Sequence, residues 1–264
     1  MSPRGRPALE GLFLRKRSAG EKLLVPYLTA GLPSPQRFID LASDLAAFAD
    51  ALEIGLPFSD PMMDGPIIQE ASRRALEEGA TPQGAVALAG QTVGMTGLPV
   101  IVMSYFNPIH RAGAKPFIEK LSKAGVSGLI VPDLPFEESE ELRKHLAGSG
   151  IASIQMIGPT TPESRAHKIA AASSGFVYAV SRLGVTGEQE ALDEGAGPLV
   201  SLIRAGTDLP VLLGIGISGP EQAAAAAKIA DGVIVGSALM KKVLSEDMPG
   251  AVSLVKRLRE ALTG

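Results

Sequence analysis

The sequence contains no cysteine, which excludes disulfide bonds, cysteine-ligated zinc and a thiol nucleophile. It also lacks a basic excess, because its formal net charge is -3 and its pI is about 5.7. That balance argues against nucleic acid and anionic membranes as partners. No apolar run approaches the ~20 residues of a membrane span, and none of signal-peptide length follows the first residues. We therefore expect a soluble, cytoplasmic protein.

Short apolar runs recur along the chain and end in turn-forming residues. Strands that are buried on both faces of a parallel sheet have this pattern. The predicted strands are Leu23–Gly31, Ala51–Gly55, Pro99–Tyr105, Gly128–Pro135, Ile151–Pro159, Gly175–Ser181, Pro210–Ser218 and Gly232–Leu239. Amphipathic segments between them predict helices at Pro35–Ala49, Pro116–Ala124, Glu137–Gly148, Pro162–Ser173 and Pro220–Ala230.

Repeated strand–helix units, spaced by roughly 25 residues, predict a closed (β/α)8 TIM barrel. We expect one barrel domain over residues 1–264. A doubly wound open sheet is the alternative, and the number of strands favours the barrel. The wide interval between the second and third strands has room for an extra helix at Ile67–Gly79. Helical character in Ala8–Arg17 predicts an N-terminal segment that closes the bottom of the barrel.

Glycine-rich segments end the last two predicted strands, at Gly214–Ser218 and Val235–Ala238. Glycine lets the backbone approach a ligand closely, and a helix that begins there directs free N–H groups at an anion. Tight strand-to-helix turns are the alternative. Because barrels commonly bind phosphate after their seventh and eighth strands, we favour a phosphate site. The Ser181–Glu188 segment has the glycines of a mobile lid, although an ordinary exposed loop fits its composition equally well.

Glu53 interrupts an apolar predicted strand. Burial disfavours a charged carboxylate, so Glu53 is either paired with a cation or has a raised pKa. A raised pKa suits a group that donates and reclaims a proton near neutrality. A structural ion pair with a neighbouring strand is the alternative. Asp64 lies in a proline- and glycine-rich loop that could fold over the barrel mouth, but Asp-Gly is also a common turn.

Carbon–carbon bond cleavage needs an electron sink, and this sequence offers no obvious one. No lysine lies within a predicted strand, where it could form a Schiff base; Lys241 and Lys242 follow the turn after the last strand. The histidines, His110, His145 and His167, are dispersed, so we predict no metal site. A carbon–carbon lyase with this sequence would therefore take its electron sink from the substrate.

Several motifs together resemble the tryptophan synthase alpha subunit family. They are Leu23–Gly31, Ala49–Asp64, Pro132–Ser139, Ser181–Gly187 and Gly214–Ser218. The most specific are Pro-Phe-Ser-Asp-Pro followed by Asp-Gly-Pro, and Ser-Arg-x-Gly-Val-Thr-Gly. The resemblance extends in order from about Leu12 to the last helix.

The resemblance implies cleavage of indole-3-glycerol phosphate to indole and glyceraldehyde 3-phosphate. Protonation of the indole ring at C3 would make the ring nitrogen iminium-like and so supply the electron sink. Glu53 matches the family's acid–base residue, and Asp64 matches the carboxylate that binds the indole N–H. The residues that match phosphate donors are Gly187, Gly216, Gly236 and Ser237. The residues that match the indole pocket are Tyr27, Ile68, Met103, Ile130, Tyr178 and Ile215, and Thr186 matches the lid threonine that orients the aspartate.

The sequence departs from the family pattern at two positions. Ile215 replaces an aromatic residue, which would remove a ring stack worth about 0.5–1.5 kcal/mol. Leu32 stands where an acidic residue is common, and the change could loosen a loop near the mouth. Neither departure affects the two carboxylates, so the expected class of reaction is unchanged.

The resemblance also implies a beta subunit that carries pyridoxal phosphate, an α2β2 assembly, and transfer of indole through a tunnel. This chain itself is expected to hold no cofactor. The expected interface residues are Pro57, Asp60, Pro61 and Pro135, and the apolar, proline-rich loop at 57–63 suits burial against another protein. A free-standing lyase and a non-catalytic barrel that binds a phosphorylated ligand are the alternatives.

Overall fold

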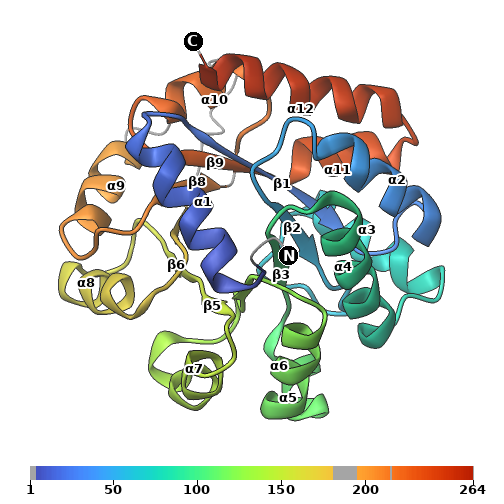
Figure 1. The fold of residues 1–264 in the computed structure, drawn as a ribbon, viewed down its shortest axis with the longest axis horizontal. Coiled ribbons are helices and arrows are strands. Elements are labelled where there is room, and N and C mark those ends of the chain that lie inside the picture. The colour runs from blue at the N-terminus through green and yellow to red at the C-terminus, as the bar shows by residue number, and fades with distance from the viewer. Residues whose placement is uncertain (1–3, 181–194, 215, 264) are drawn as a thin grey trace.

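The strands of the chain form a parallel sheet that closes on itself (Figure 1). The structure is a computed structural model and describes residues 4–180, 195–214 and 216–263. The strands in these residues are β1 (Leu23–Thr29), β2 (Leu52–Gly55), β3 (Val100–Met103), β4 (Gly128–Ile130), β5 (Ala152–Ser153), β6 (Gln155–Ile157), β7 (Val177–Val180), β8 (Val211–Gly214) and β9 (Gly232–Val235).

The order of the strands confirms the predicted barrel. In the described residues it is β5-β4-β3-β2-β1-β9-β8-β7-β6, and every pair is parallel. The two ends of this order, β5 and β6, are separated in the chain by Ile154 alone. They are therefore two parts of one strand, which pairs with β4 on one side and β7 on the other. This strand closes the barrel.

Helices surround the strands (Figure 1). They are α1 (Arg6–Ser18), α2 (Pro35–Leu45), α3 (Pro66–Glu77), α4 (Pro82–Thr96), α5 (Phe106–Ala112), α6 (Ala114–Lys123), the 3-10 helix η1 (Phe136–Glu138), α7 (Glu140–Ala147), α8 (Glu163–Ala172), α9 (Ala196–Arg204), α10 (Pro220–Ala227), α11 (Ser237–Leu244) and α12 (Met248–Thr263). The predicted extra helix after the second strand is confirmed as α3. No helix among the described residues is long and apolar enough to cross a membrane.

The helix starts follow from local sequence. Ser34 caps α2, because its side chain accepts a hydrogen bond from the backbone N–H of Arg37. Thr81 caps α4 in the same way, by accepting a bond from Gly84 at 3.1 Å. In both helices proline follows the cap, where its missing N–H costs no hydrogen bond.

Several strands end earlier than the apolar runs predict. The run Gly128–Pro135 forms a strand only to Ile130, and Ile151–Pro159 forms the short strands β5 and β6. The residues beyond β4 are apolar for another reason, because Val131 and Leu134 line a cavity above the barrel. The apolar run therefore continues from the strand into the wall of the cavity and does not locate the end of the strand.

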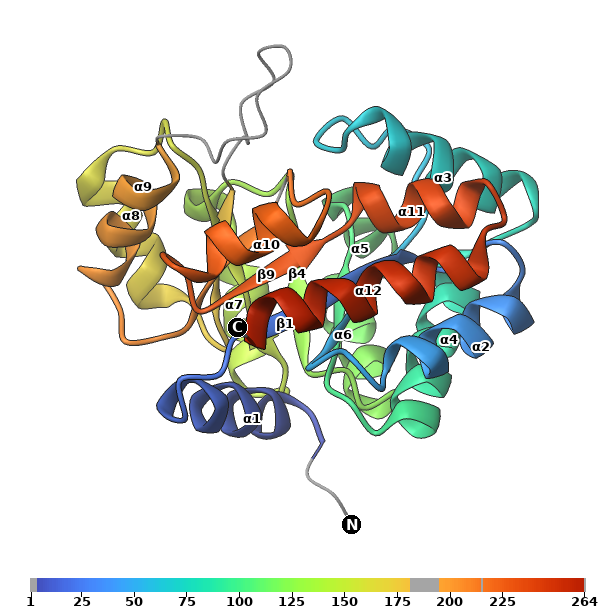
Figure 2. The same ribbon diagram turned by 90° about the horizontal axis from the view of Figure 1, so that it is seen from above.

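Helix α1 closes the bottom of the barrel, as the sequence predicts, and lies at the opposite end from α3 (Figure 2). Its Leu9 and Phe13 side chains are fully buried, and the ring of Phe13 lies 5.7 Å from that of Phe176. Glu10 accepts a hydrogen bond from the backbone N–H of Gly175 at 3.0 Å, just before β7 begins.

Two buried aspartates stabilise the same end of the barrel. Asp50, before β2, accepts a bond from the N–H of Leu24 at 2.8 Å and pairs with Lys16 and Arg259. Asp231, before β9, accepts a bond from the N–H of Val211 at 2.8 Å and pairs with Arg204 at 3.0 Å. Every buried charge here has a partner, which a buried charge requires if it is not to destabilise the fold.

Candidate active site

A cavity of about 1000 Å³ opens at the carboxyl ends of the strands. This is the end at which barrels of this type carry their active sites, and the volume is sufficient for a ligand the size of a drug molecule. Residues from β1, β2, β3, β6, β7 and β9 line it, together with residues of the loops and helices that follow the strands. The cavity contains both carboxyl groups that the sequence singled out, Glu53 and Asp64.

Glu53 lies on β2 and is 1% exposed. No described residue forms an ion pair with it, and its buried Oε2 atom has no hydrogen-bond partner. Burial, and then the negative charge of Asp64, raises the pKa of Glu53 to about 8. The carboxyl group is therefore largely protonated at neutral pH, in contrast to the paired aspartates at the bottom of the barrel. The described residues do not support the alternative of a structural ion pair.

Two tyrosines lie across glycines on the neighbouring strands. A Cβ atom added to Gly55 would lie 2.0 Å from the hydroxyl oxygen of Tyr27, and one added to Gly214 would lie 2.1 Å from that of Tyr178. Both tyrosines line the cavity and are nearly buried, at 5% and 7% exposure. Burial raises the pKa of each phenol, so both stay neutral. Each ring occupies the space that a side chain on the next strand would need.

Asp64 lies in the loop between β2 and α3, and its carboxylate is fixed by a residue at the end of β3. The hydroxyl of Tyr105 donates a hydrogen bond of 3.0 Å to Asp64 Oδ2. The ring of Phe58, in the same loop as Asp64, stacks on Tyr105 at 5.1 Å. Burial raises the pKa of Asp64 to about 6, although the hydrogen bond from Tyr105 opposes this shift. Asp64 is therefore mostly ionised at neutral pH.

The glycine-rich strand ends also border the cavity. Gly216, Gly236 and Ser237 all line it, and α11 begins at Ser237. Gly216 has a φ of 92°, a conformation that favours glycine. The first N–H groups of a helix have no intrahelical partner, so the start of α11 offers donors to an anion. Thr186, Gly187 and Ile215 lie outside the described residues.

The structure brings most, but not all, of the predicted pocket residues together. Tyr27, Ile68, Met103 and Tyr178 line the cavity. Ile130 does not; it is fully buried in the core. Of the expected interface residues, Pro135 lines the cavity, Asp60 is exposed, Pro61 is half-buried and Pro57 is buried. Leu32 is 4% exposed and packs in the hydrophobic core, which explains how an apolar side chain fits that position.

Sequence reasoning missed several residues of the site. Tyr105 is the most important: it binds Asp64 but does not itself line the cavity, and its place at the end of a predicted strand was the only signal available. Arg165 and Lys241 do line the cavity. Arg165 forms a two-pronged ion pair with Glu137, at 2.7 and 2.9 Å. No group of described His, Asp or Glu residues is arranged to hold a metal ion.

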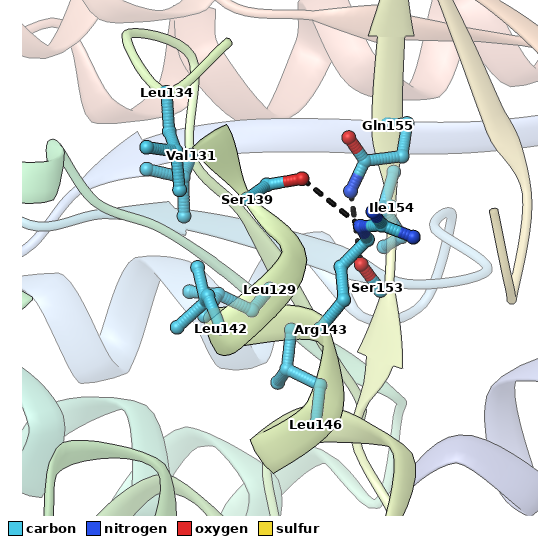
Figure 3. A pocket seen from close by; sticks show the side chains of 10 residues that line it. All are labelled: Leu129, Val131, Leu134, Ser139, Leu142, Arg143, Leu146, Ser153, Ile154 and Gln155. Atoms are coloured by element: carbon cyan, nitrogen blue, oxygen red, sulfur yellow. Dashed lines mark hydrogen bonds between the residues drawn. The ribbon is translucent and has the colours of Figure 1, made fainter. Parts of the chain in front are cut away.

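A second, much smaller pocket adjoins the cavity beneath η1 and α7 (Figure 3). Val131, Leu134, Ile154 and Gln155 line both spaces. Arg143 donates to Ser139 at 3.0 Å, and Gln155 donates to Ser153 at 2.9 Å, so its polar groups bind one another. Its free volume of about 10 Å³ is at the limit for one water molecule, which excludes it as an organic ligand site.

Comparison with known proteins decides the family. The family model described as tryptophan synthase alpha chain matches residues 13–262. The chain belongs to the tryptophan synthase alpha chain family. Relatives of that name include those of Carboxydothermus hydrogenoformans, 45% identical over 87% of this chain and 86% of its own length, and of Chloroflexus aggregans, 42% identical over 94% and 96%. Membership supports an enzymatic role in tryptophan biosynthesis.

Solved structures of tryptophan synthase share the fold over nearly the whole chain. A structure of the Mycobacterium tuberculosis enzyme is 34% identical with a TM-score of 0.89, and covers 98% of this chain and 99% of its own. The alpha subunit from Legionella pneumophila is 32% identical with a TM-score of 0.88, and covers 97% and 98%. These similarities confirm the barrel.

Proposed function

We propose that this chain cleaves indole-3-glycerol phosphate to indole and glyceraldehyde 3-phosphate. One observation carries the proposal: Glu53, a buried carboxyl group without a partner among the described residues, shares a cavity with an ionised carboxylate, Asp64. The two groups have different proton affinities, as a reaction that needs one acid and one anion requires. Membership of the tryptophan synthase alpha chain family supports the choice of substrate.

In the first step Glu53 donates its proton to C3 of the indole ring. The ring nitrogen becomes iminium-like and carries the positive charge. Asp64 stabilises that charge by accepting a hydrogen bond from the ring N–H. A fixed anion in a cavity shielded from water stabilises a developing cation far more than water-exposed groups do.

In the second step the bond between C3 and the side chain breaks. Its electron pair returns to the ring and restores the neutral indole, while the adjacent hydroxyl becomes the carbonyl of the aldehyde. The hydroxyl proton passes to the Glu53 carboxylate, which restores the acid for the next cycle. Atoms and charge balance without a metal or an added cofactor, because the indole ring is the electron sink.

The remaining parts of the cavity fit the rest of this substrate. Tyr27, Ile68, Met103 and Tyr178 offer an apolar surface for the indole ring. The start of α11, with Gly216 and Gly236, offers N–H donors for the phosphate group. Thr186, Gly187 and Ile215 remain sequence-based proposals for the lid, the phosphate and the indole, respectively.

We further propose that the cavity opens onto a beta subunit that carries pyridoxal phosphate, in an α2β2 assembly. Met62 and Met63, on the loop that carries Asp64, are 85% and 61% exposed. Large exposed apolar side chains beside an active site are typical of a surface that another protein covers. Pro57, Asp60, Pro61 and Pro135 are proposed members of the same interface.

The test is release of indole from indole-3-glycerol phosphate by the wild type and by Glu53→Gln. We expect the variant to lose at least ~10²-fold in turnover, the usual effect of removing a general acid, while it still binds the substrate. Glu119→Gln, at an exposed position on α6, is the matched control and should retain full activity. Normal turnover by Glu53→Gln would contradict the mechanism.

The same assay separates the alternatives. Binding of the substrate without any turnover by the wild type would identify a non-catalytic barrel. Turnover that does not increase when a beta subunit is added, in a chain that does not bind the beta subunit, would identify a free-standing lyase. Stimulation of indole release on adding a beta subunit, together with co-elution of the two chains in size-exclusion chromatography, is the result we expect.

A further inference from the structure

The cavity contains a cation that has no partner among the described residues and no role in the reaction described above. Within the described residues, the cationic side chains that line it are Arg165 and Lys241. Arg165 is already neutralised, because Glu137 accepts hydrogen bonds from two of its nitrogen atoms, at 2.7 and 2.9 Å. Lys241 forms no hydrogen bond or ion pair with any residue that the structure describes. Its positive charge is therefore available to a ligand.

The position of Lys241 on α11 brings this charge toward the predicted phosphate site. Lys241 follows Ser237 by four residues, so both lie on the same face of the helix, and both line the cavity. Side chains on a helix point back toward its N-terminus. The Lys241 side chain therefore extends toward Gly236 and Ser237, where the free N–H groups of α11 begin.

The next residue shows that this arrangement is specific to one position. Lys242 does not line the cavity, and its ammonium group pairs with Asp247 at 2.9 Å. Two neighbouring lysines on one helix thus differ. Lys242, outside the cavity, is paired with a carboxylate, and Lys241, at the cavity, has no partner among the described residues.

We propose that Lys241 is a binding residue for the phosphate group of the ligand, and that it supplies the positive charge which the backbone N–H donors of α11 lack. The identity of the ligand rests on the proposed function, but the assignment requires only a phosphorylated ligand. Backbone N–H groups fix the geometry of a phosphate and carry only partial charge. A lysine adds a full point charge that needs no fixed orientation.

The proposal predicts affinity that depends on charge and on salt. Lys241 is exposed, so water and ions screen it, and its contribution should be moderate. We expect Lys241→Met to weaken binding of glycerol 3-phosphate about twofold to fivefold at low ionic strength. The difference from wild type should shrink as salt is added. Binding of indole, which has no charge, should not change.

The experiment is calorimetric titration of glycerol 3-phosphate and of indole into the wild type, Lys241→Met, Lys241→Arg and Lys242→Met. Lys242→Met is the matched control and should bind glycerol 3-phosphate like the wild type. Lys241→Arg should restore most of the affinity, because it keeps the charge. Equal affinity in Lys241→Met and wild type, or an equal loss in Lys242→Met, would overturn the assignment. So would a wild type that does not bind glycerol 3-phosphate.

This test can fail independently of the proposed function. A wild type that binds glycerol 3-phosphate through Lys241 but never releases indole from indole-3-glycerol phosphate would refute the reaction and leave Lys241 in place. A wild type that releases indole, with unchanged glycerol 3-phosphate affinity in Lys241→Met, would refute the role of Lys241 and leave the reaction in place.

Discussion

The hydroxyl group of Tyr105 donates a hydrogen bond to Asp64 and accepts one from the backbone N–H of Met63, each at 3.0 Å. One side chain, in the loop after β3, thus holds both the carboxylate and the backbone of the loop after β2. The carboxylate lines the cavity, yet its position depends on a residue from a different loop of the barrel. Tyr105 is therefore a positioning residue for Asp64, and removal of its hydroxyl group should change both the rate of the reaction and its dependence on pH.

Replacing Tyr105 by Phe should keep the ring stack on Phe58 and remove only the hydroxyl group. We expect kcat/KM for indole release to fall by about 10- to 150-fold, because the loss of one hydrogen bond to a charged group costs about 1.5–3 kcal/mol. The hydrogen bond from Tyr105 lowers the pKa of Asp64. Its loss should therefore move the acid limb of the pH–rate profile to higher pH. A lower rate with an unmoved acid limb would indicate a purely structural role.

The activity itself should have a bell-shaped dependence on pH. Asp64 must be ionised, and its pKa is raised to about 6; Glu53 must be protonated, and its pKa is raised to about 8. We expect kcat/KM to fall below about pH 6 and above about pH 8, as these pKa values require. Rates that stay constant well above pH 8 would mean that Glu53 does not act as an acid.

Stability should reveal the same protonation of Glu53 independently of any substrate. Burial raises its pKa from 4.5 to about 8, so the folded protein holds the proton more tightly than the unfolded chain does. The free energy of unfolding should therefore decrease as the pH rises between these two values. Glu53→Gln cannot ionise and should lack this decrease, which is at most about 5 kcal/mol. Urea unfolding of both proteins at pH 5 and pH 9 tests this; parallel pH dependences would contradict it.

Gly55 should not tolerate a larger residue. A Cβ atom there would lie 2.0 Å from the hydroxyl of Tyr27, so Gly55→Ala must displace a buried ring that lines the cavity. We expect a loss of about 1–3 kcal/mol in the free energy of unfolding, together with reduced activity. Gly94→Ala in α4 is the control, because apart from its chain neighbours and the backbone of its own helix no atom lies within 4 Å of the added Cβ. It should be neutral or slightly stabilising.

The apolar runs of the sequence predict the barrel and also single out Glu53 as a candidate site residue. Parallel strands need continuous apolar runs, so their number is visible in the sequence, and a lone glutamate within such a run stands out. The ends of the strands are not visible, because Val131 and Leu134 remain apolar in order to line the cavity. An apolar run in the sequence cannot distinguish residues that form the strand from residues that line the cavity beyond it.

The sequence does not predict contacts between residues that lie far apart along the chain. Asp64 and Tyr105 are 41 positions apart, and only the barrel brings them together. The same is true of Tyr178 and Gly214, which meet because β7 pairs with β8. Ile130, which the family pattern places in the pocket, is fully buried and does not line the cavity of the structure. Thr186, Gly187 and Ile215 stay predictions, as do the interface residues.

The two ends of the barrel can be altered for different purposes. At the bottom, Asp50 and Asp231 are each tied to arginine side chains from outer helices, so this layer fastens α9 and α12 to the strands. At the mouth, Glu53 has no such tie within the described residues. Substitutions meant to raise thermal stability are best placed at the bottom of the barrel, where added bonds do not affect proton transfer by Glu53. A cation introduced beside Glu53 would lower the pKa of this carboxyl group and remove the proton that the proposed reaction needs.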